Sequence, residues 1–170
     1  MKIISRIWVV ALLFTGLSSV HAQIDTISPY LKSGRIPAFS IPTIPDSNYF
    51  AHTDLKPGLP FIVMIFSPEC SHCKEIARSL AGRMELLEGF QILMVSSMPM
   101  DRIRFFAQET GISNYQNVIL GKDQDYSVGK FYRIRTLPSL YLYNEKGQFV
   151  RKFEFKDIEV EQILDALKNE

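Results

Sequence analysis

The feature that most constrains this chain is a short apolar run followed closely by two cysteines. Residues 61–66 read Phe-Ile-Val-Met-Ile-Phe, and Cys70 and Cys73, the only cysteines of the chain, come directly after. The run has the length and composition of a buried strand. Pro68 ends it, because proline has no N–H to give to a sheet ladder. We therefore expect a strand, a tight turn and then an element that carries both cysteines.

That element is expected to be a helix. Apolar residues recur every three or four positions after the cysteines, at Ile76, Leu80, Met84 and Leu87. This is the period of one helix face. Cys73 extends the face backwards by one step, so its thiol is predicted to point into the core. Cys70 would then lie at the helix N-terminus, where unpaired N–H groups carry partial positive charge.

This placement predicts two chemically unequal thiols. The positive end of the helix, helped by His72, is expected to stabilise the Cys70 thiolate. The thiolate is the nucleophile of disulfide exchange, and a cysteine one helical turn away can close a disulfide on it. The sequence therefore predicts that Cys70 attacks and Cys73 resolves, while Ser71 and His72 between them tune the redox chemistry.

A structural disulfide and a zinc site are the alternatives to redox chemistry. A disulfide that closes so short a loop removes little entropy from the unfolded chain. A zinc site requires about four ligands, whereas His72 is the only histidine beside the cysteines and His52 is remote. Redox chemistry is favoured, with no metal and no cofactor other than a Cys70–Cys73 disulfide.

The N-terminus has the pattern of a secretory signal peptide. Lys2 and Arg6 precede an apolar run at 7–14, and Val20-His21-Ala22 is an acceptable cleavage site before Gln23. We expect 1–22 to be this signal and the protein to be exported, to the periplasm or another extracytoplasmic space.

Cleavage after Ala22 also bears on partners. It removes two basic residues and no acidic one, which changes the formal charge from +1 to −1. Such a balance does not indicate nucleic-acid binding. The alternative is an uncleaved anchor that tethers the protein to the membrane, although the apolar stretch at 7–17 is shorter than the roughly 20 residues that span a bilayer.

The rest of the chain is interpreted as a tail at 23–35 and one domain at 36–170. The tail carries few periodic apolar residues. In the domain, the runs at 61–66 and 90–96 are nearly continuous in apolar residues, which is typical of parallel strands buried on both faces. Further strands are expected near 36–44, 49–50, 117–120, 139–143 and 148–155, and further helices after Pro99, Asp125 and Asp157.

Three local placements follow from these patterns. The helix after Pro99 should end at Gly111, and it should turn one face inward, made of Ile103, Phe106, Ala107 and Thr110. In the last strand, Phe149, Phe153 and Phe155 should share one face. Asp157 is expected to cap the final helix.

With these elements in place, residues 36–170 resemble the thioredoxin superfamily. The resemblance rests on the strand with its Cys-x-x-Cys helix, on the stretch Thr136-Leu137-Pro138-Ser139, and on the closing hairpin and helix. It implies an α/β three-layer sandwich: a central mixed sheet flanked by helices, with an extra strand and helix inserted before a cis-proline. Pro138 matches that proline, which X–Pro chemistry permits. By resemblance, Thr136, Leu137 and Pro138 form the substrate groove beside the dithiol.

The extra elements, the exported N-terminus and the lead-in Phe-Ser-Pro-Glu-Cys look most like the TlpA-like extracytoplasmic thiol-disulfide oxidoreductases. Two positions depart from cytosolic thioredoxins, because Met64 stands where they have a buried acid and Glu69 where they have tryptophan. Glu75, two residues after Cys73, is a candidate proton acceptor, as a helix carboxylate is in some TlpA-like proteins. The alternative is a solvated glutamate in the first helical turn.

These observations predict an enzyme, an extracytoplasmic thiol-disulfide oxidoreductase that works through Cys70-Ser71-His72-Cys73 as a reductase. Its partners would be protein thiols and disulfides of the cell envelope and an upstream membrane electron donor, and it would be a monomer. The alternative is a non-catalytic binding module of the envelope with the same fold. Peroxide reduction is excluded, because the pattern Pro-x-x-x-Thr-x-x-Cys is absent.

Overall fold

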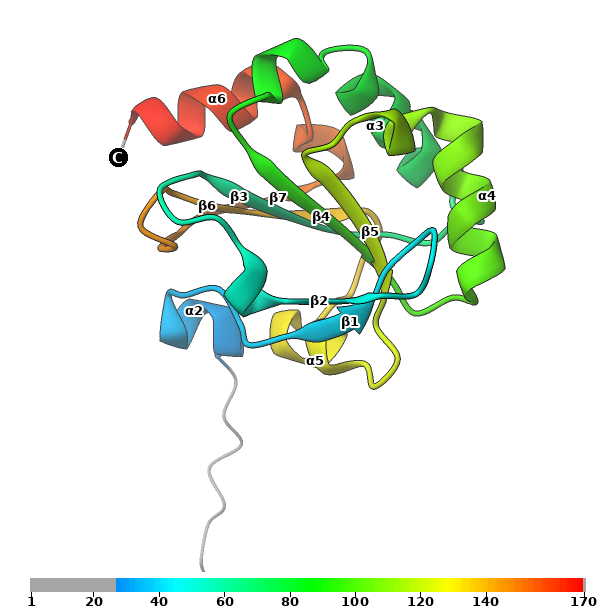
Figure 1. The fold of residues 1–170 in the computed structure, drawn as a ribbon. Helices are drawn as coiled ribbons and strands as arrows, with labels where there is room; N and C mark the ends of the chain where they lie inside the picture. The colour runs from blue at the N-terminus through cyan, green and yellow to red at the C-terminus, as the bar shows by residue number, and fades with distance from the viewer. Residues whose placement is uncertain (1–26, 170) are drawn as a thin grey trace, which may run out of the picture.

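The central apolar run forms the middle strand of a five-stranded mixed sheet (Figure 1). In this computed structural model, which describes residues 27–169, that strand is β3 (Phe61–Ile65). The parallel partner β4 (Gln91–Ser96) was predicted, and β6 (Ser139–Tyr143) pairs with β3 in antiparallel register. β3 is therefore enclosed by a strand on each side, and its carboxyl end leads directly to the cysteines.

Two edge strands complete the sheet in the order β5-β4-β3-β6-β7. β5 (Val118–Lys122) pairs in parallel with β4, and β7 (Phe149–Glu154) pairs in antiparallel register with β6. The strand β5 and the helix α5 (Ser127–Tyr132) lie in the sequence between α4 (Met100–Thr110) and Pro138. The predicted extra strand and helix before the proline are thus confirmed.

Helices and a hairpin cover the two faces of this sheet (Figure 1). On one face lie α4 and two further helices, α3 (Ser71–Ala81) and α6 (Val160–Lys168). On the other lie α5, α2 (Pro29–Ser33) and the hairpin of β1 (Ser40–Pro42) and β2 (Tyr49–Ala51), two strands paired in antiparallel register. Short 3₁₀ turns join some of these elements, at η1 (His52–Asp54), η2 (Met84–Leu87), η3 (Ile112–Asn114) and η4 (Phe155–Asp157).

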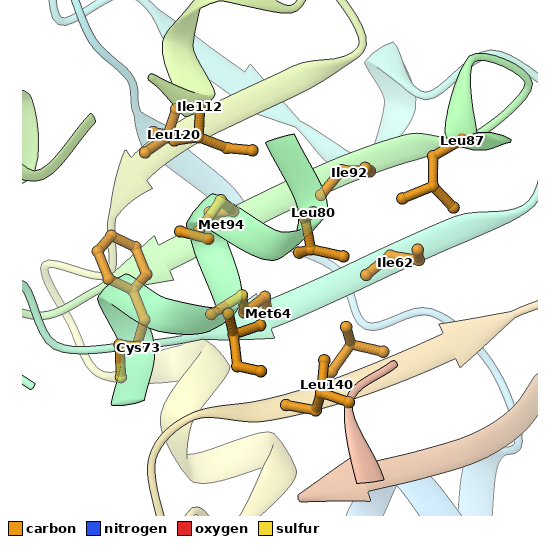
Figure 2. Close-up of a cluster of buried hydrophobic side chains, with 14 of the residues drawn as sticks. Ile62, Met64, Cys73, Leu80, Leu87, Ile92, Met94, Ile112, Leu120 and Leu140 are labelled. Atoms are coloured by element: carbon orange, nitrogen blue, oxygen red, sulfur yellow. The ribbon is translucent and has the colours of Figure 1, made fainter. Parts of the chain in front are cut away.

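Alternation along the strands sends side chains into two separate cores. From β3, Ile62 and Met64 enter the core under α3, α4 and α6, which we call the helix-side core (Figure 2). Their neighbours Phe61 and Val63 enter the opposite core, the tyrosine-side core. Four buried tyrosines mark that second core: Tyr30, Tyr132, Tyr141 and Tyr143. Both faces of β3 are thus buried, which explains its unbroken apolar sequence.

The helix α4 follows its predicted pattern. The inward face is buried as expected, at Ile103, Phe106, Ala107 and Thr110. Gly111 ends the helix with φ 71°, a left-handed conformation that glycine adopts without the steric cost borne by other residues.

The predicted tail at 23–35 is wrong for the part that the structure describes, because α2 forms within it. Tyr30 is buried, and its ring lies 5.0 Å from the Phe149 ring and 5.1 Å from the Tyr141 ring. The Phe149 N–H donates a hydrogen bond of 2.8 Å to the carbonyl of Gly34. Aromatic packing therefore makes this segment part of the domain.

Two predictions near the C-terminus are also wrong: the shared face of Phe149 and Phe153, and the helix cap at Asp157. A register shift in β7 lies opposite Leu142 and Tyr143, and one extra residue reverses the facing of the residues beyond it. Phe149 therefore packs in the tyrosine-side core, while Phe153 packs in the helix-side core. Asp157 belongs to η4 rather than to a helix cap, and α6 has Glu159 at its N-cap without a side-chain hydrogen bond.

The predicted signal peptide at 1–22 lies outside the described residues. Within 27–169, none of the helices has the length and apolar character needed to cross a membrane.

Candidate functional site

Cys70 is the N-cap of α3. Its backbone N–H donates to the carbonyl of Ser67 over 3.1 Å, which closes the turn after β3. The N–H of Cys73 then donates to the Cys70 sulfur over 3.3 Å, the bond that an N-cap side chain makes to the first turn of a helix. The half-buried Cys70 sulfur thus accepts an N–H that has no partner within the helix.

Cys73 lies one turn further along and is 0% exposed. It belongs to the helix-side core, which also holds Met64 and Leu80 (Figure 2). Burial, with a smaller contribution from the hydrogen bond to Cys70, raises the pKa of the Cys73 thiol far above its ordinary value. Both cysteines are free thiols, and Cys73 remains protonated at neutral pH.

The loop before β6 brings Pro138 to the same place. The Leu137–Pro138 bond is cis, as the resemblance implies. The Cys70 thiol lies 3.9 Å from the Leu137 carbonyl oxygen, to which it donates. Pro138 is buried, whereas the Thr136 side chain is exposed and that of Leu137 is 36% exposed. The structure therefore assembles Cys70, Cys73 and the predicted groove residues at one end of the sheet.

Glu75 is not assembled with them. It is exposed, and residues two positions apart on a helix do not face one another, so it points away from Cys73. Among the described residues, the groups that perturb the Cys73 thiol are Cys70 and the backbone of Ser67 and of Cys73 itself. Met64, at the position of the thioredoxin acid, is fully buried and apolar. A carboxylate base for Cys73 is therefore not found in 27–169.

His72 has a partner that the sequence did not predict. Its ring lies face to face with the ring of Phe155 in η4, with centroids 3.8 Å apart and planes inclined by 14°. Among the described residues, no hydrogen bond joins His72 to either sulfur. Phe155 follows His72 by more than 80 residues in the sequence, so no local pattern could pair them. Ser71, the other residue between the cysteines, is exposed.

Two sets of charged side chains near the site form ion pairs. Lys74 and Arg78 of α3 contact Glu109 of α4 at 2.8 and 2.9 Å, and the hydrogen bond from Lys74 is the main cause of a lowered pKa at Glu109. On β7, Lys152 contacts Glu154 at 2.6 Å and lowers the pKa of that carboxyl. These exposed pairs contribute little stability, but the contacts of Glu109 with Lys74 and Arg78 link α4 to α3.

Within 27–169, His, Cys, Asp and Glu side chains do not gather in any group of three or more suited to a metal ion.

No family model and no curated protein sequence matches the chain. Solved structures do match it. The thioredoxin domain of a thiol-disulfide oxidoreductase from Bacteroides vulgatus has a TM-score of 0.61 at 20% identity, over 79% of this chain and 94% of that one. A secreted Mycobacterium tuberculosis disulfide oxidoreductase, described as homologous to Escherichia coli DsbE, has a TM-score of 0.62 at 15% identity, over 75% and 95%.

A third similar structure is that of DsbF from Mycobacterium tuberculosis, described in mixed oxidised and reduced forms. Its TM-score is 0.62 at 15% identity, over 75% of this chain and 94% of that one. Identities this low carry information about the fold. The sheet order, the Cys-x-x-Cys helix and the cis-proline beside it agree with that likeness. This chain therefore has the thioredoxin fold.

Proposed function

We propose that this protein is an extracytoplasmic thiol-disulfide oxidoreductase that reduces disulfides of protein substrates through Cys70 and Cys73. One observation carries the proposal. The Cys70 sulfur lies at the N-terminus of α3 and accepts a helix N–H, while Cys73, three residues later, is buried in the core. A structural disulfide would not need one accessible sulfur placed at a helix N-terminus, whereas disulfide exchange does.

The reaction proceeds in two exchanges. The Cys70 thiolate attacks a sulfur of the substrate disulfide, which forms a mixed disulfide and releases the other substrate sulfur as a thiolate. Cys73 then attacks the Cys70 sulfur, loses its proton to solvent or to the departing substrate sulfur, and releases the substrate. The substrate gains two electrons and two protons, and Cys70 and Cys73 are left as a disulfide. A dithiol donor must reduce that disulfide before the next cycle.

The groove residues are proposed to hold the substrate chain during the first exchange. The Leu137 carbonyl already lies beside the Cys70 sulfur, and the neighbouring Thr136 and Leu137 side chains are exposed to a partner. An extended substrate segment lying along this loop would bring its disulfide to Cys70. Binding by backbone contacts would suit a range of protein substrates.

Export, the reductase direction and a membrane electron donor are parts of the same proposal. The pattern of 1–22 supports export, and one of the similar structures is described as secreted. An oxidising compartment favours disulfides, so a dithiol that acts there as a reductase requires a supply of electrons.

The test compares Cys70→Ser with Cys73→Ser in the reduction of insulin disulfides. We expect both variants to lose turnover, and only Cys73→Ser to accumulate a mixed disulfide that dithiothreitol releases. If Cys70→Ser traps the substrate instead, the roles are reversed. If both variants bind envelope proteins as the wild type does and insulin reduction is absent throughout, the protein is a binding module and the proposal is wrong.

A further inference from the structure

The stack of His72 on Phe155 joins two parts of the molecule at the edge of the dithiol. His72 is the second residue of α3, directly between the cysteines. Phe155 opens η4, just after Glu154, which pairs with Ser139 next to Pro138. The Phe155 ring is half-buried and packs against the helix-side core. The core therefore holds the Phe155 ring in place, and the imidazole stacks on a face of that ring.

The stack determines where an exposed imidazole can be. A histidine at the start of a helix and on the surface would otherwise sample several side-chain rotamers. Face-to-face contact at 3.8 Å with a ring anchored in the core selects the rotamer that lies over η4. His72 is exposed, and among the described residues Phe155 is the only ring on which it stacks.

The selected rotamer matters because an imidazole is a hydrogen-bond donor. The Cys70 sulfur accepts one N–H, from Cys73, and a second donor would stabilise its thiolate further. Stabilising the thiolate stabilises the reduced pair and makes the protein a stronger oxidant. With His72 stacked on Phe155, the structure contains no such second bond from the imidazole.

We propose that Phe155 is a positioning residue of the dithiol: it holds the His72 ring on η4 and so withholds an N–H donor from the Cys70 sulfur. The inference rests on the proposed function, because it concerns the redox balance of the Cys70–Cys73 pair. Its effect is to keep the pair more reducing, the direction that a reductase needs. Phe155 thereby acts on the sulfur through His72, without touching it.

The experiment measures the thiol-disulfide equilibrium of the full chain in glutathione buffers. Phe155→Leu keeps an apolar side chain and removes the ring face. We expect it to shift the equilibrium toward the dithiol by about tenfold, which is about 30 mV for a two-electron couple. His72→Ala should stay within about twofold of wild type, and Phe155→Leu should lose its shift when combined with His72→Ala, because no imidazole remains to be released.

Phe149→Leu is the matched control. Like Phe155, Phe149 is a half-buried phenylalanine, but it lies at the start of β7 and packs against Tyr30 and Tyr143 in the tyrosine-side core. The same chemical change there should leave the equilibrium within about twofold of wild type. A shift in Phe149→Leu equal to that in Phe155→Leu would overturn the proposal, since general loosening of the fold would then explain both.

Proton NMR of the His72 ring gives a readout that does not depend on redox chemistry. A ring stacked on Phe155 should show upfield-shifted imidazole protons in the wild type and in Phe149→Leu, and ordinary shifts in Phe155→Leu. If Phe155→Leu does not fold, the proposal is tested by the ring-proton shifts of the wild type and by the thiol-disulfide equilibrium of His72→Ala. Unshifted ring protons, or a tenfold more reducing His72→Ala, would overturn the proposal because the imidazole would then not be withheld.

Failure of the proposed function has a different signature. If Cys70 and Cys73 form no intramolecular disulfide at any glutathione ratio in wild type or variants, both proposals are wrong. If the disulfide forms normally but Phe155→Leu leaves the equilibrium unchanged, or shifts it equally with and without His72, only the role of Phe155 is wrong.

Discussion

Cys70 and Cys73 are the same residue type one helical turn apart, and the protein surrounds them differently. Cys70 lies at the helix N-terminus, where its sulfur is hydrogen-bonded to a backbone N–H and to the Leu137 carbonyl. Cys73 lies among apolar side chains of the helix-side core, where burial holds its thiol protonated. The position of the helix start, rather than the chemistry of cysteine, therefore divides the roles of the two sulfurs.

The largest expected effect comes from placing a charge beside Cys73. Met64→Asp puts a carboxylate without a partner into the helix-side core, where Met64 is fully buried. We expect the free energy of unfolding in urea to fall by about 3–5 kcal/mol at neutral pH. Met64→Leu, which conserves volume, should lose less than about 1.5 kcal/mol. Equal stability of the two variants would show that water reaches the carboxylate, so that the core around Cys73 is not dry.

On the Cys70 side, we expect Pro138→Ala to alter the groove rather than the core beside Cys73. Pro138 follows Leu137, whose carbonyl lies beside the Cys70 sulfur. We expect insulin reduction to slow by about tenfold, equivalent to about 1.4 kcal/mol of lost transition-state binding. Reaction of Cys70 with a small disulfide should change much less. If both reactions slow equally, the proline acts on the sulfur itself and the groove has no separate role.

Alkaline pH should reveal Cys73 in the stability of the reduced protein. Because burial raises the pKa of the folded thiol, only the unfolded chain ionises at first, so the stabilisation is complete below about pH 8.5 and is lost as the pH rises. Between about pH 9 and 10 the wild type should lose about 1.4 kcal/mol more than Cys73→Ala.

Urea unfolding of the reduced proteins at several pH values checks this difference. The buried Tyr132, Tyr141 and Tyr143 also have raised pKa values, and they destabilise both proteins alike at higher pH. Parallel stability curves for the wild type and Cys73→Ala would contradict the burial of this thiol.

The smallest effect is expected for Glu75→Gln. Glu75 is exposed and points away from Cys73, so the decay of the mixed disulfide, followed by quenched samples, should stay within about twofold of wild type. A tenfold slower decay would identify Glu75 as the proton acceptor for Cys73 and would remove the solvent or substrate sulfur from that role.

Much of the fold could be predicted because its information is local. The run at 61–66, the period of α3 and the stop at Gly111 each lie within one element, and hydrophobic spacing was enough to place them. The burial of Cys73 followed from the same spacing. The cis bond before Pro138 came from the resemblance, and its place beside Cys70 required the sheet to be formed.

The rest depends on contacts between distant segments. Tyr30 makes α2 part of the fold by packing on rings more than 100 residues away, and nothing in the short segment itself indicates that. The shift in β7 that turns Phe149 to the other face arises where two strands pair. Phe155 became visible as a site residue only when η4 brought it to His72.

Competitive alkylation of the two reduced cysteines would show directly whether the protein makes the two thiols unequal. The folded protein is treated at neutral pH with limiting iodoacetamide, and labelled peptides are quantified by mass spectrometry, with a sample unfolded in urea for comparison. We predict that Cys70 reacts at least about a hundredfold faster than Cys73 in the folded protein and that urea brings the rates within a few fold. Equal rates in the folded protein, or faster labelling of Cys73, would show that Cys70 is not the attacking thiol.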